Sequence, residues 1–494
     1  MNYKMVGFVL GRIFLIEAAL MLFPMGCAAI YGEWSVVLSF LWPTLIVLAL
    51  GLITSLRTPQ NTKIYARDGL AIVALVWVLM SVFGAMPFVI SGEIPSFVDA
   101  FFETVSGFTT TGSTILTDVE ALSHGTLFWR SFSHWIGGMG ILVFLLAVLP
   151  LVGGSNMQLM KAESPGPSVG KLVPKVRFTA RILYVLYVAL TLLQVLVMLM
   201  GGMTLYEALC TSFGTAGTGG FGIYGDSIAR FSPFLQWAIT VFMIAFGVNF
   251  NVYFLLYMRR PKDALHCEEM HWYLGIITAA ALLICVNAYD VTLTLENNLR
   301  QSFFQVASII TTTGFATTDF NLWPGFSHSI LVLLMFIGAC AGSTGGGLKV
   351  SRIVIGFKSV LTYLGAFLHP RAVRKVKFED KDVDAETMHA ICVYFIAAIG
   401  LFVISVLLVA LDGFDLVTTF SAVAATFNNI GPGLGVAGPT SNFAAFSDFS
   451  KVVMTMDMLL GRLEVFPMLM LFYPPLWKES IGEARIRRNR TALH

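Results

Sequence analysis

The chain has 494 residues, of which 56% are hydrophobic and 12% charged, with a formal net charge of +2, and its mean hydropathy is +0.79. A soluble protein of this length needs a far more polar surface than these residues can supply. The composition therefore excludes a soluble globular protein and indicates a protein that crosses a membrane many times. We expect lipid around it and no nucleic-acid partner.

In chain order, long apolar runs predict ten transmembrane helices, each long enough to cross a hydrocarbon layer of roughly 30 Å. They lie near residues 13–31, 35–56, 69–91, 126–152, 179–201, 232–258, 270–289, 328–366, 388–411 and 448–477. If the N-terminus is cytoplasmic, 26 of the 31 Lys and Arg residues fall inside or at the inner membrane edge. The positive-inside rule then places both termini in the cytoplasm.

The first apolar run has no small-residue cleavage site, so we interpret it as a retained helix rather than a signal peptide. The polar stretch 153–178 contains three prolines and is typical of a flexible connector. The six cysteines have no paired spacing and no CxxC motif, which argues against a disulfide framework or a cysteine metal site. We expect no cofactor.

Four segments between the spans share one plan, a short semi-apolar helix followed by a Gly/Thr-rich turn. They read FVDAFFETVSGFTTTGSTIL, TLYEALCTSFGTAGTGGFGIY, LRQSFFQVASIITTTGFATTDF and LVTTFSAVAATFNNIGPGLGVAG. Their apolar runs are too short to span, so we predict re-entrant loops. Irregular backbone at membrane depth persists only where it lines an aqueous cavity or is buried in protein. The four segments therefore predict a pore where they meet.

The four segments also predict an internal repeat. The glycines that align are Gly112, Gly220, Gly314 and Gly431, and a second glycine landmark follows them at 137, 247, 338 and 461. Because each unit has an even number of crossings, the repeats should be parallel, around an axis along the membrane normal. We predict an N-terminal transmembrane hairpin (1–56) and repeats at 57–152, 153–258, 259–368 (second helix broken) and 369–494 (with a basic cytoplasmic tail). The expected fold is an all-α polytopic membrane protein with about ten transmembrane helices around a central pore.

The chemistry of these loops fits a filter for a monovalent cation. Such an ion, once dehydrated, needs several oxygen ligands, which backbone carbonyls around an axis supply, and glycine enters the required backbone conformations freely. The predicted filter residues are Thr110, Thr111, Gly112, Thr218, Gly219, Gly220, Thr312, Thr313, Gly314, Asn429, Ile430 and Gly431. The fourth loop differs, because Asn and Ile precede its glycine, so the filter would be pseudo-symmetric. The alternative is four ordinary Gly/Thr turns between helices.

A glycine-rich interruption of the long span 328–366 predicts a movable constriction. Five glycines between 338 and 347 cannot remain a rigid helix, at about 1 kcal/mol each relative to alanine. The predicted gate residues are Gly342, Ser343, Thr344, Gly345, Gly346, Gly347 and Lys349, with Arg462 of the last span. Close helix packing through small residues is the alternative for the interruption. Arg462, two residues before Glu464, is either an electrostatic barrier in the pathway or a structural cation satisfied by carbonyls or a carboxylate.

The outer segments carry thirteen Asp and Glu residues against Arg130, Arg230, Arg300 and Lys451. A negative vestibule would concentrate cations, although the positive-inside bias alone leaves an acidic outer side. We interpret Asn249, Asn251 and the Arg12/Glu17 pair as helix contacts or snorkelling groups.

The motifs TTTGST, TGGF, TTTGF, NNIGPGLG, GSTGGGLK and GRLE together resemble those of the Trk/Ktr/HKT superfamily of potassium transporters. NNIGPGLG and the additional N-terminal hairpin make the chain similar to the bacterial TrkH/TrkG subunits. The resemblance covers essentially the whole chain. It implies a multi-pass protein of the bacterial inner membrane that translocates potassium as a homodimer with one pore per protomer. It also implies a regulatory cytoplasmic nucleotide-binding ring of TrkA type, a filter at the aligned glycines with their preceding residues, a gating loop at 342–349 and a pathway role for Arg462.

The expected function is potassium uptake without catalysis. A sodium-permeable or ion-coupled secondary transporter is the alternative, and channel and symport mechanisms both stay open. A membrane-embedded enzyme is disfavoured, because HExxH, GxSxG and P-loop motifs are missing from the sequence. His134 is the nearest candidate for such chemistry, but a lone histidine beside Trp135 is typical of a core or interfacial group.

Overall fold

The computed structural model describes residues 1–61, 64–140, 176–290, 293–369 and 374–477. In these ranges the regular structure is helical except for a two-stranded hairpin, β1 (Lys377–Phe378) and β2 (Lys381–Asp382). The predicted all-α class is therefore confirmed. Most of the predicted connector 153–178, the second half of the predicted span 126–152 and the basic tail lie outside the described residues.

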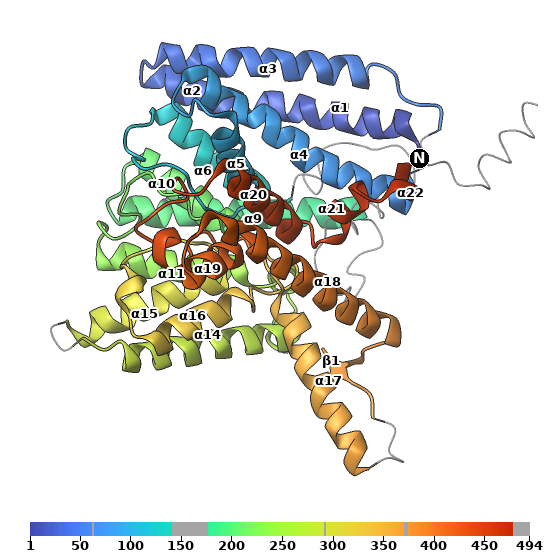
Figure 1. Ribbon diagram of the computed structural model, residues 1–494, viewed down its shortest axis with the longest axis vertical. Helices are drawn as coiled ribbons and strands as arrows, with labels where there is room; N and C mark the ends of the chain where they lie inside the picture. The colour runs from blue at the N-terminus through green and yellow to red at the C-terminus, as the bar shows by residue number, and fades with distance from the viewer. Residues whose placement is uncertain (62–63, 141–175, 291–292, 370–373, 478–494) are drawn as a thin grey trace, which may run out of the picture.

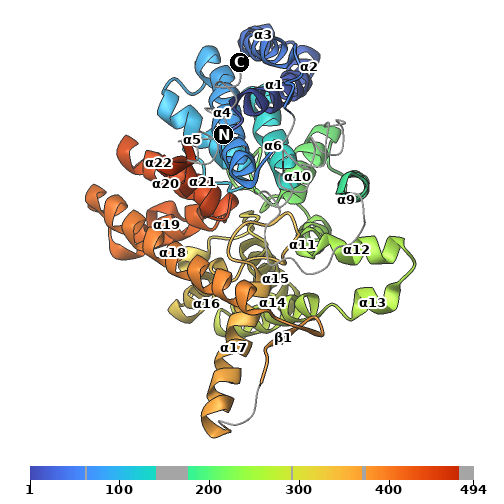
Figure 2. The same cartoon turned by 90° about the vertical axis from the view of Figure 1, so that its right-hand side faces the viewer.

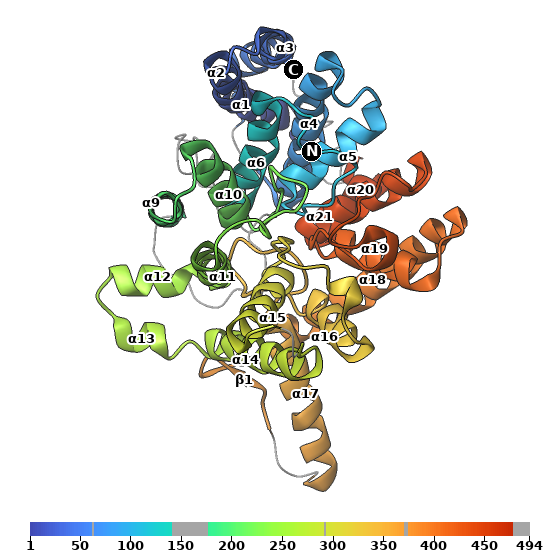
Figure 3. The same cartoon turned by 90° about the vertical axis from the view of Figure 1, so that its left-hand side faces the viewer.

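The helices fall into groups arranged around a common centre (Figures 1, 2 and 3). The first groups are α1 (Tyr3–Leu20), α2 (Leu22–Ile30), α3 (Trp34–Ser55), α4 (Ala66–Ser91), α5 (Phe97–Phe108), α6 (His124–Gly138), α9 (Val176–Met200), α10 (Leu205–Gly217), α11 (Pro233–Gly247), α12 (Phe250–Tyr257) and α13 (Pro261–Leu265). The others are α14 (Glu268–Asn287), α15 (Leu295–Ile310), α16 (Gly325–Met335), α17 (Val350–Leu368), α18 (Ala385–Val409), α19 (Leu416–Phe427), α20 (Asp448–Arg462), α21 (Phe466–Leu471) and α22 (Pro474–Trp477), with short 3-10 turns at Phe320–Leu322, Ala410–Asp412 and Gly435–Ala437.

Seven helical stretches are long and apolar enough to cross a membrane: Tyr3–Ile30, Trp34–Ser55, Arg67–Ser91, Ala180–Met200, Glu268–Asn287, Val350–Leu368 and Ala385–Asp412. An eighth candidate is the pair α11 and α12, which bends by 88°. The predicted spans 328–366 and 448–477 are each divided, between α16 and α17 and between α20 and α21. Ten crossings therefore stay a prediction, which rests on counting these divided helices and the partly described 126–152 as spans.

The predicted start of the first span was wrong, because the helix begins at Tyr3 rather than near residue 13. The Asn2 side chain caps it by accepting a hydrogen bond from the backbone N–H of Met5. The sequence prediction relied on an uninterrupted apolar run, and the charged residues Lys4 and Arg12 interrupt that run in the first part of the helix. Of the two interpretations of Glu17, snorkelling was wrong and a helix contact stays: the side chain is fully buried, and neither carboxyl oxygen has a hydrogen-bond partner in the described residues.

The four short helices that precede the predicted filter turns, α5, α10, α15 and α19, begin in the same way. Each follows a residue whose side-chain oxygen accepts a hydrogen bond from the backbone N–H three residues on, a strong helix start signal. The capping residues are Ser96, Thr204, Thr294 and Asp415. Hydrogen bonds from Thr418 hold the pKa of the exposed Asp415 carboxyl below its ordinary value, because they favour the ionised form that caps the helix.

The N-terminal hairpin is held by close packing of α1 on α3. A β-carbon added to Gly11 would lie 2.1 Å from the Thr54 hydroxyl oxygen and 3.1 Å from the Ser55 backbone nitrogen. One added to Gly51 would lie 3.0 Å from the Gly11 carbonyl oxygen. The two glycines therefore set how closely the helices approach, as small residues do in membrane helix pairs.

We expect Gly11→Val to lower the free energy of unfolding by about 1–3 kcal/mol, because overpacking forces α1 and α3 apart. Thermal unfolding of the purified protein in detergent measures this as a lower midpoint. Gly7→Val is the matched control, since a β-carbon at Gly7 on the same helix meets no atom within 4 Å. Equal midpoints for the two variants would contradict the packing argument.

Candidate functional site

The four aligned glycines meet in one closed ring. Each has a positive φ, with values of 84°, 75°, 86° and 103° for Gly112, Gly220, Gly314 and Gly431. Each faces the carbonyl oxygen of the residue just before the aligned glycine of the next loop, and the last loop faces the first. A β-carbon would lie 1.9, 1.9, 2.4 and 2.8 Å from that oxygen in the pairs Gly112 with Gly219, Gly220 with Thr313, Gly314 with Ile430, and Gly431 with Thr111. Only glycine allows this approach.

The backbone path is the same in all four loops, including the one with the divergent sequence. Two residues before each ring glycine, a non-glycine residue adopts φ between 55° and 60°: Thr110, Thr218, Thr312 and Asn429. The next residue donates its N–H to the carbonyl five positions back, in the pairs Thr111 to Ser106, Gly219 to Gly214, Thr313 to Ser308 and Ile430 to Ala425. Asn tolerates the left-handed region better than most residues, so NNIG keeps the geometry that TTTG and GTGG adopt.

Two side chains tie neighbouring loops together. The His134 ring lies between the first two loops: Nδ1 is 2.8 Å from the Gly107 carbonyl oxygen, and Phe221 donates its N–H to Nε2 at 3.3 Å. Because Nε2 accepts, Nδ1 carries the proton and the imidazole is neutral. The Asn429 amide donates to the Thr111 hydroxyl oxygen and to the Met458 carbonyl, both at 2.9 Å, which joins the fourth loop to the first.

A buried ion pair supports the first loop on its outer side. Arg130 donates to Glu103 at 2.8 Å, and the same carboxylate accepts from the Thr114 hydroxyl and the Ile115 N–H. The Arg130 guanidinium also lies 4.1 Å from the centre of the Phe221 ring of the second loop. Breaking such a pair would leave an uncompensated buried charge, so it fixes both loops firmly.

All four outer cations form ion pairs: Arg130 with Glu103, Arg230 with Glu120 and Asp226, Arg300 with Glu296, and Lys451 with Asp99. These four cations contact five of the thirteen acidic residues counted in the sequence. Pairing does not change the excess of thirteen acidic residues over four basic ones, so the negative vestibule stays a prediction. In the described part of the chain, no group of three His, Cys, Asp or Glu side chains could hold a metal ion.

The interruption of the long span is an irregular segment, residues 338–349, which we call the gate loop. It lies against the ring, because Gly346 donates its N–H to the Thr312 hydroxyl at 2.8 Å. The gate loop also lies alongside the bend between α11 and α12. The Cys340 N–H donates to the Gly247 carbonyl at 3.1 Å, and the Phe250 N–H donates to the Gly342 carbonyl at 3.0 Å. Asn249, at that bend, makes a helix contact as expected, because its amide donates to Glu269 of α14 at 3.4 Å, and it also lies beside the gate loop at Gly342.

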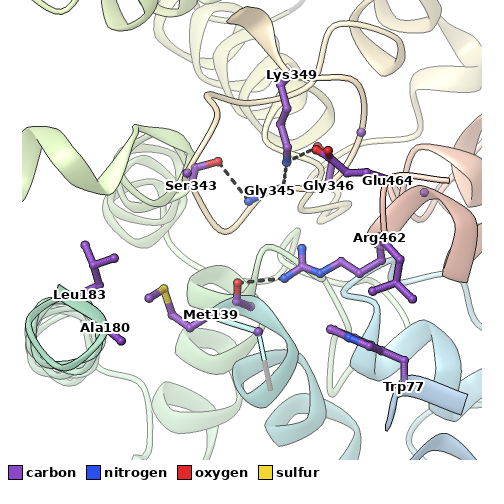
Figure 4. Close-up of a pocket in the computed structure, with 16 residues that line it drawn as sticks. Trp77, Met139, Ala180, Leu183, Ser343, Gly345, Gly346, Lys349, Arg462 and Glu464 are labelled. Carbon is purple, nitrogen blue, oxygen red and sulfur yellow. Dashed lines mark hydrogen bonds between the residues drawn. The ribbon is translucent and has the colours of Figure 1, made fainter. Parts of the chain in front are cut away.

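Two cations hold the carbonyl groups of the gate loop (Figure 4). Lys349 is almost fully buried, and its ammonium group donates to the carbonyls of Gly345 and Gly346, the latter at 3.0 Å. Its φ of 74° is unusual for lysine and directs the side chain back to the loop. The Arg462 guanidinium donates to the Thr344 carbonyl at 2.9 Å and to the last carbonyls of α6, at Gly137 and Gly138.

These groups border a cavity of about 90 Å³ next to the gate loop, lined also by Trp77, Met139 and Leu183. The bonds from Arg462 to carbonyls are the contacts expected of a structural cation, which is one of the two roles that the sequence left open. Glu464 accepts from Arg352 of α17 at 2.5 Å. It lies in the break between α20 and α21, where Glu464 and Val465 have φ of 57° and 67°.

The sequence matches the TrkH family, described as cation transport proteins, over residues 36–479. Curated relatives include the Trk system potassium uptake proteins TrkH of Salmonella typhimurium, 37% identical, and of Escherichia coli K12, 36% identical. Each alignment covers 97% of this chain and all of the relative. Among solved structures, the potassium transporter TrkH from Vibrio parahaemolyticus superposes with a TM-score of 0.86 at 32% identity, covering 97% of this chain and all of that one.

We expect His134→Ala to destabilise the protein by about 2–5 kcal/mol, because it leaves a cavity and two buried backbone groups without partners. The measurement is the unfolding midpoint in detergent. His271→Ala, at an exposed position, is the control and should change the free energy by less than about 0.5 kcal/mol. An unchanged midpoint for His134→Ala would show that the imidazole does not hold the loops.

Proposed function

The chain belongs to the TrkH family of cation transport proteins, and we propose that it takes up potassium across the bacterial inner membrane through the ring of four loops. The observation that carries this proposal is the closed cycle in which each ring glycine faces the carbonyl of the next loop. Four carbonyl-bearing strands around one axis offer the multiple oxygen ligands that a dehydrated monovalent cation requires. Transport, rather than catalysis, is the activity of this family.

In the proposed filter, each ring glycine and the two residues before it supply the carbonyls, namely residues 110–112, 218–220, 312–314 and 429–431. Their shared backbone path supports equivalent roles for all four segments, despite the different fourth sequence. The side chains of His134, Asn429 and Arg130 would hold the carbonyls at fixed distances. A rigid set of oxygens is one means by which a filter distinguishes potassium from sodium.

We propose that the gate loop, with Lys349 and Arg462, closes the pathway next to the filter. The ammonium of Lys349 binds the carbonyl oxygens that a passing cation would otherwise contact. The positive charges of Lys349 and Arg462 also repel an approaching cation. Opening then requires Lys349 and Arg462 to release these carbonyls. The hydrogen bond from Gly346 to Thr312 supports a closed gate loop that lies directly against the ring.

The partners that we propose are a second copy of the chain and a cytoplasmic nucleotide-binding ring of TrkA type. α17 projects from the rest of the molecule (Figure 1) and exposes large apolar side chains that a second copy or lipid would cover. These are Phe357, Val360, Leu361, Tyr363, Leu364, Phe367 and Leu368. Chemical crosslinking of the purified protein tests the dimer.

The first functional test is substitution of ring glycines, measured as rubidium uptake in cells that lack other potassium uptake systems. We expect Gly112→Ser and Gly314→Ser to abolish most uptake, because a side chain at these positive φ values collides with the carbonyl of the next loop. Gly225→Ser is the matched control, since a β-carbon there meets open space. Undiminished uptake in both ring variants would refute the filter.

The second test concerns the gate. We expect Lys349→Met to raise rubidium flux into proteoliposomes by about tenfold, because losing about 1.4 kcal/mol of closed-state stability changes the open population by that factor. The potassium-to-sodium permeability ratio should stay as in the unaltered protein, since the ring is untouched. Lys262→Met, at an exposed cytoplasmic-side lysine, is the control.

A folded Lys349→Met protein with unchanged or lower flux would contradict the gate assignment. Reversal potentials measured with potassium, sodium and pH gradients varied separately then distinguish a potassium pathway from a sodium-permeable or ion-coupled transporter. A potential that follows only the potassium gradient is the expected result.

A further inference from the structure

Glu269, near the start of α14, is a buried carboxylate that neither the ring nor the cavity uses. One of its oxygens, Oε1, accepts hydrogen bonds from the N–H groups of Ala341, at 2.7 Å, and Ser351, at 3.1 Å. The other, Oε2, accepts from the Asn249 amide at 3.4 Å. Glu269 is only 2% exposed. A single side chain therefore contacts both ends of the gate loop and the bend between α11 and α12.

This arrangement restrains the gate loop. Ala341 lies near its start, and Ser351 is in the first turn of α17, just after its end. Hydrogen bonds to a buried carboxylate are stronger than those between neutral groups, and leaving the N–H groups without a partner is costly. As long as Oε1 accepts from both, the two ends cannot separate, and the glycines between them have limited room to change their path.

The same end of α14 is bound from the cytoplasmic side by a short hairpin, residues 374–383. Glu379 lies in the turn of this hairpin, and its carboxylate accepts hydrogen bonds from the Glu269 N–H at 3.1 Å and from the Cys267 thiol at 3.4 Å. The Glu379 N–H donates to the Glu268 carboxylate at 3.2 Å. Glu269 thus bonds the hairpin through its backbone and the gate loop through its side chain.

The hairpin turn has an unusual sequence for its geometry. Glu379 and Asp380 have φ of 51° and 57°, values for which two-residue hairpin turns generally use Asn-Gly. A glutamate in this conformation is uncommon, and here it places the carboxylate against the first turn of α14. The turn therefore has residues that are unfavourable for its backbone conformation, and one of them, Glu379, makes the contact with α14.

A second connection runs from the hairpin to α17. Lys358 of α17 donates to the Lys377 carbonyl at 2.9 Å and pairs with Glu268. The hairpin lies beside α17 (Figure 1). It consequently holds α14 and α17 together, and these are the helices whose ends carry Glu269 and Ser351.

We propose that Glu269 is a positioning residue for the gate loop and that the cytoplasmic hairpin controls it through Glu379. This inference rests on the gating role proposed above. A cytoplasmic protein that moves the hairpin would displace the first turn of α14, and the Glu269 carboxylate would move with it. The hydrogen bonds to Ala341 and Ser351 would then weaken together, freeing the loop to release its carbonyls. Regulation from the cytoplasm therefore needs no contact with the gate loop itself.

The test combines hydrogen–deuterium exchange of the full-length protein in nanodiscs with rubidium flux in proteoliposomes. We expect Glu379→Ala to raise amide exchange in the hairpin and, about fivefold or more, in peptides covering the gate loop, with flux rising in parallel. Glu269→Ala should raise exchange in the gate loop and flux but leave the hairpin protected. Glu269→Gln should lie between the unaltered protein and Glu269→Ala in both readouts, because its amide oxygen can accept both N–H groups that Oε1 now accepts but carries no charge.

Glu386→Ala is the matched control, since this exposed acid lies in the first turn of α18, away from the network, and should change neither readout. The proposal is overturned if Glu379→Ala leaves the hairpin protected, or loosens it without any change in gate-loop exchange. It is also overturned if Glu269→Ala exchanges and conducts as the unaltered protein does, or if the gate loop exchanges as fast in Glu269→Gln as in Glu269→Ala. Absence of rubidium flux in the unaltered protein would refute the proposed function instead, and the exchange measurements would still decide the coupling.

Discussion

Four backbone segments from distant parts of the chain approach one another so closely that no β-carbon fits between them, and the rest of the structure follows from this contact. Each ring glycine faces a carbonyl oxygen of the next loop, so a change at one position displaces its neighbour around the whole cycle. Such a ring cannot be stabilised by side-chain packing at its centre. It depends on groups behind it, which explains why a neutral imidazole, a side-chain amide and a buried ion pair lie directly behind the loops.

The backbone carbonyls of the gate loop are stabilised in a different way from those of the ring. Its carbonyls lack the regular helix partners, and unpaired carbonyls inside a membrane protein are costly. Lys349 and Arg462 satisfy them with charge-assisted hydrogen bonds. Unfavourable backbone conformations at Lys349, Glu464 and Val465 accompany this arrangement. The ring is thus supported by neutral contacts and one buried ion pair, whereas the neighbouring loop combines unfavourable backbone conformations with two cations bound to its carbonyls.

Much of this organisation could be predicted from the sequence, and the reasons for success and failure are physical. The all-helical class and the family are confirmed, because long apolar runs and glycines at fixed spacing are local signals. The glycine that the alignment of NNIG with TTTG selected, Gly431, shares a positive φ with the other three even though the side chains before it differ. The roles of the filter and gate residues stay predictions. The predicted start of α1 was wrong, because the helix start depends on a cap that apolar periodicity does not reveal.

Glu269 shows why part of the site was invisible in the sequence. It stands beside Glu268 at the beginning of a helix, where acidic residues are common and favourable for the helix dipole, so nothing distinguishes it from its neighbour. The structure gives their side chains different partners: Glu268 pairs with Lys358 near the hairpin of residues 374–383, and Glu269 accepts hydrogen bonds at the gate loop. Two adjacent carboxylates of one helix turn therefore face opposite environments. Because a helix turn moves as a rigid unit, displacement of one side must displace the other, and this shared backbone can connect the surface that carries the hairpin to the interior of the protein.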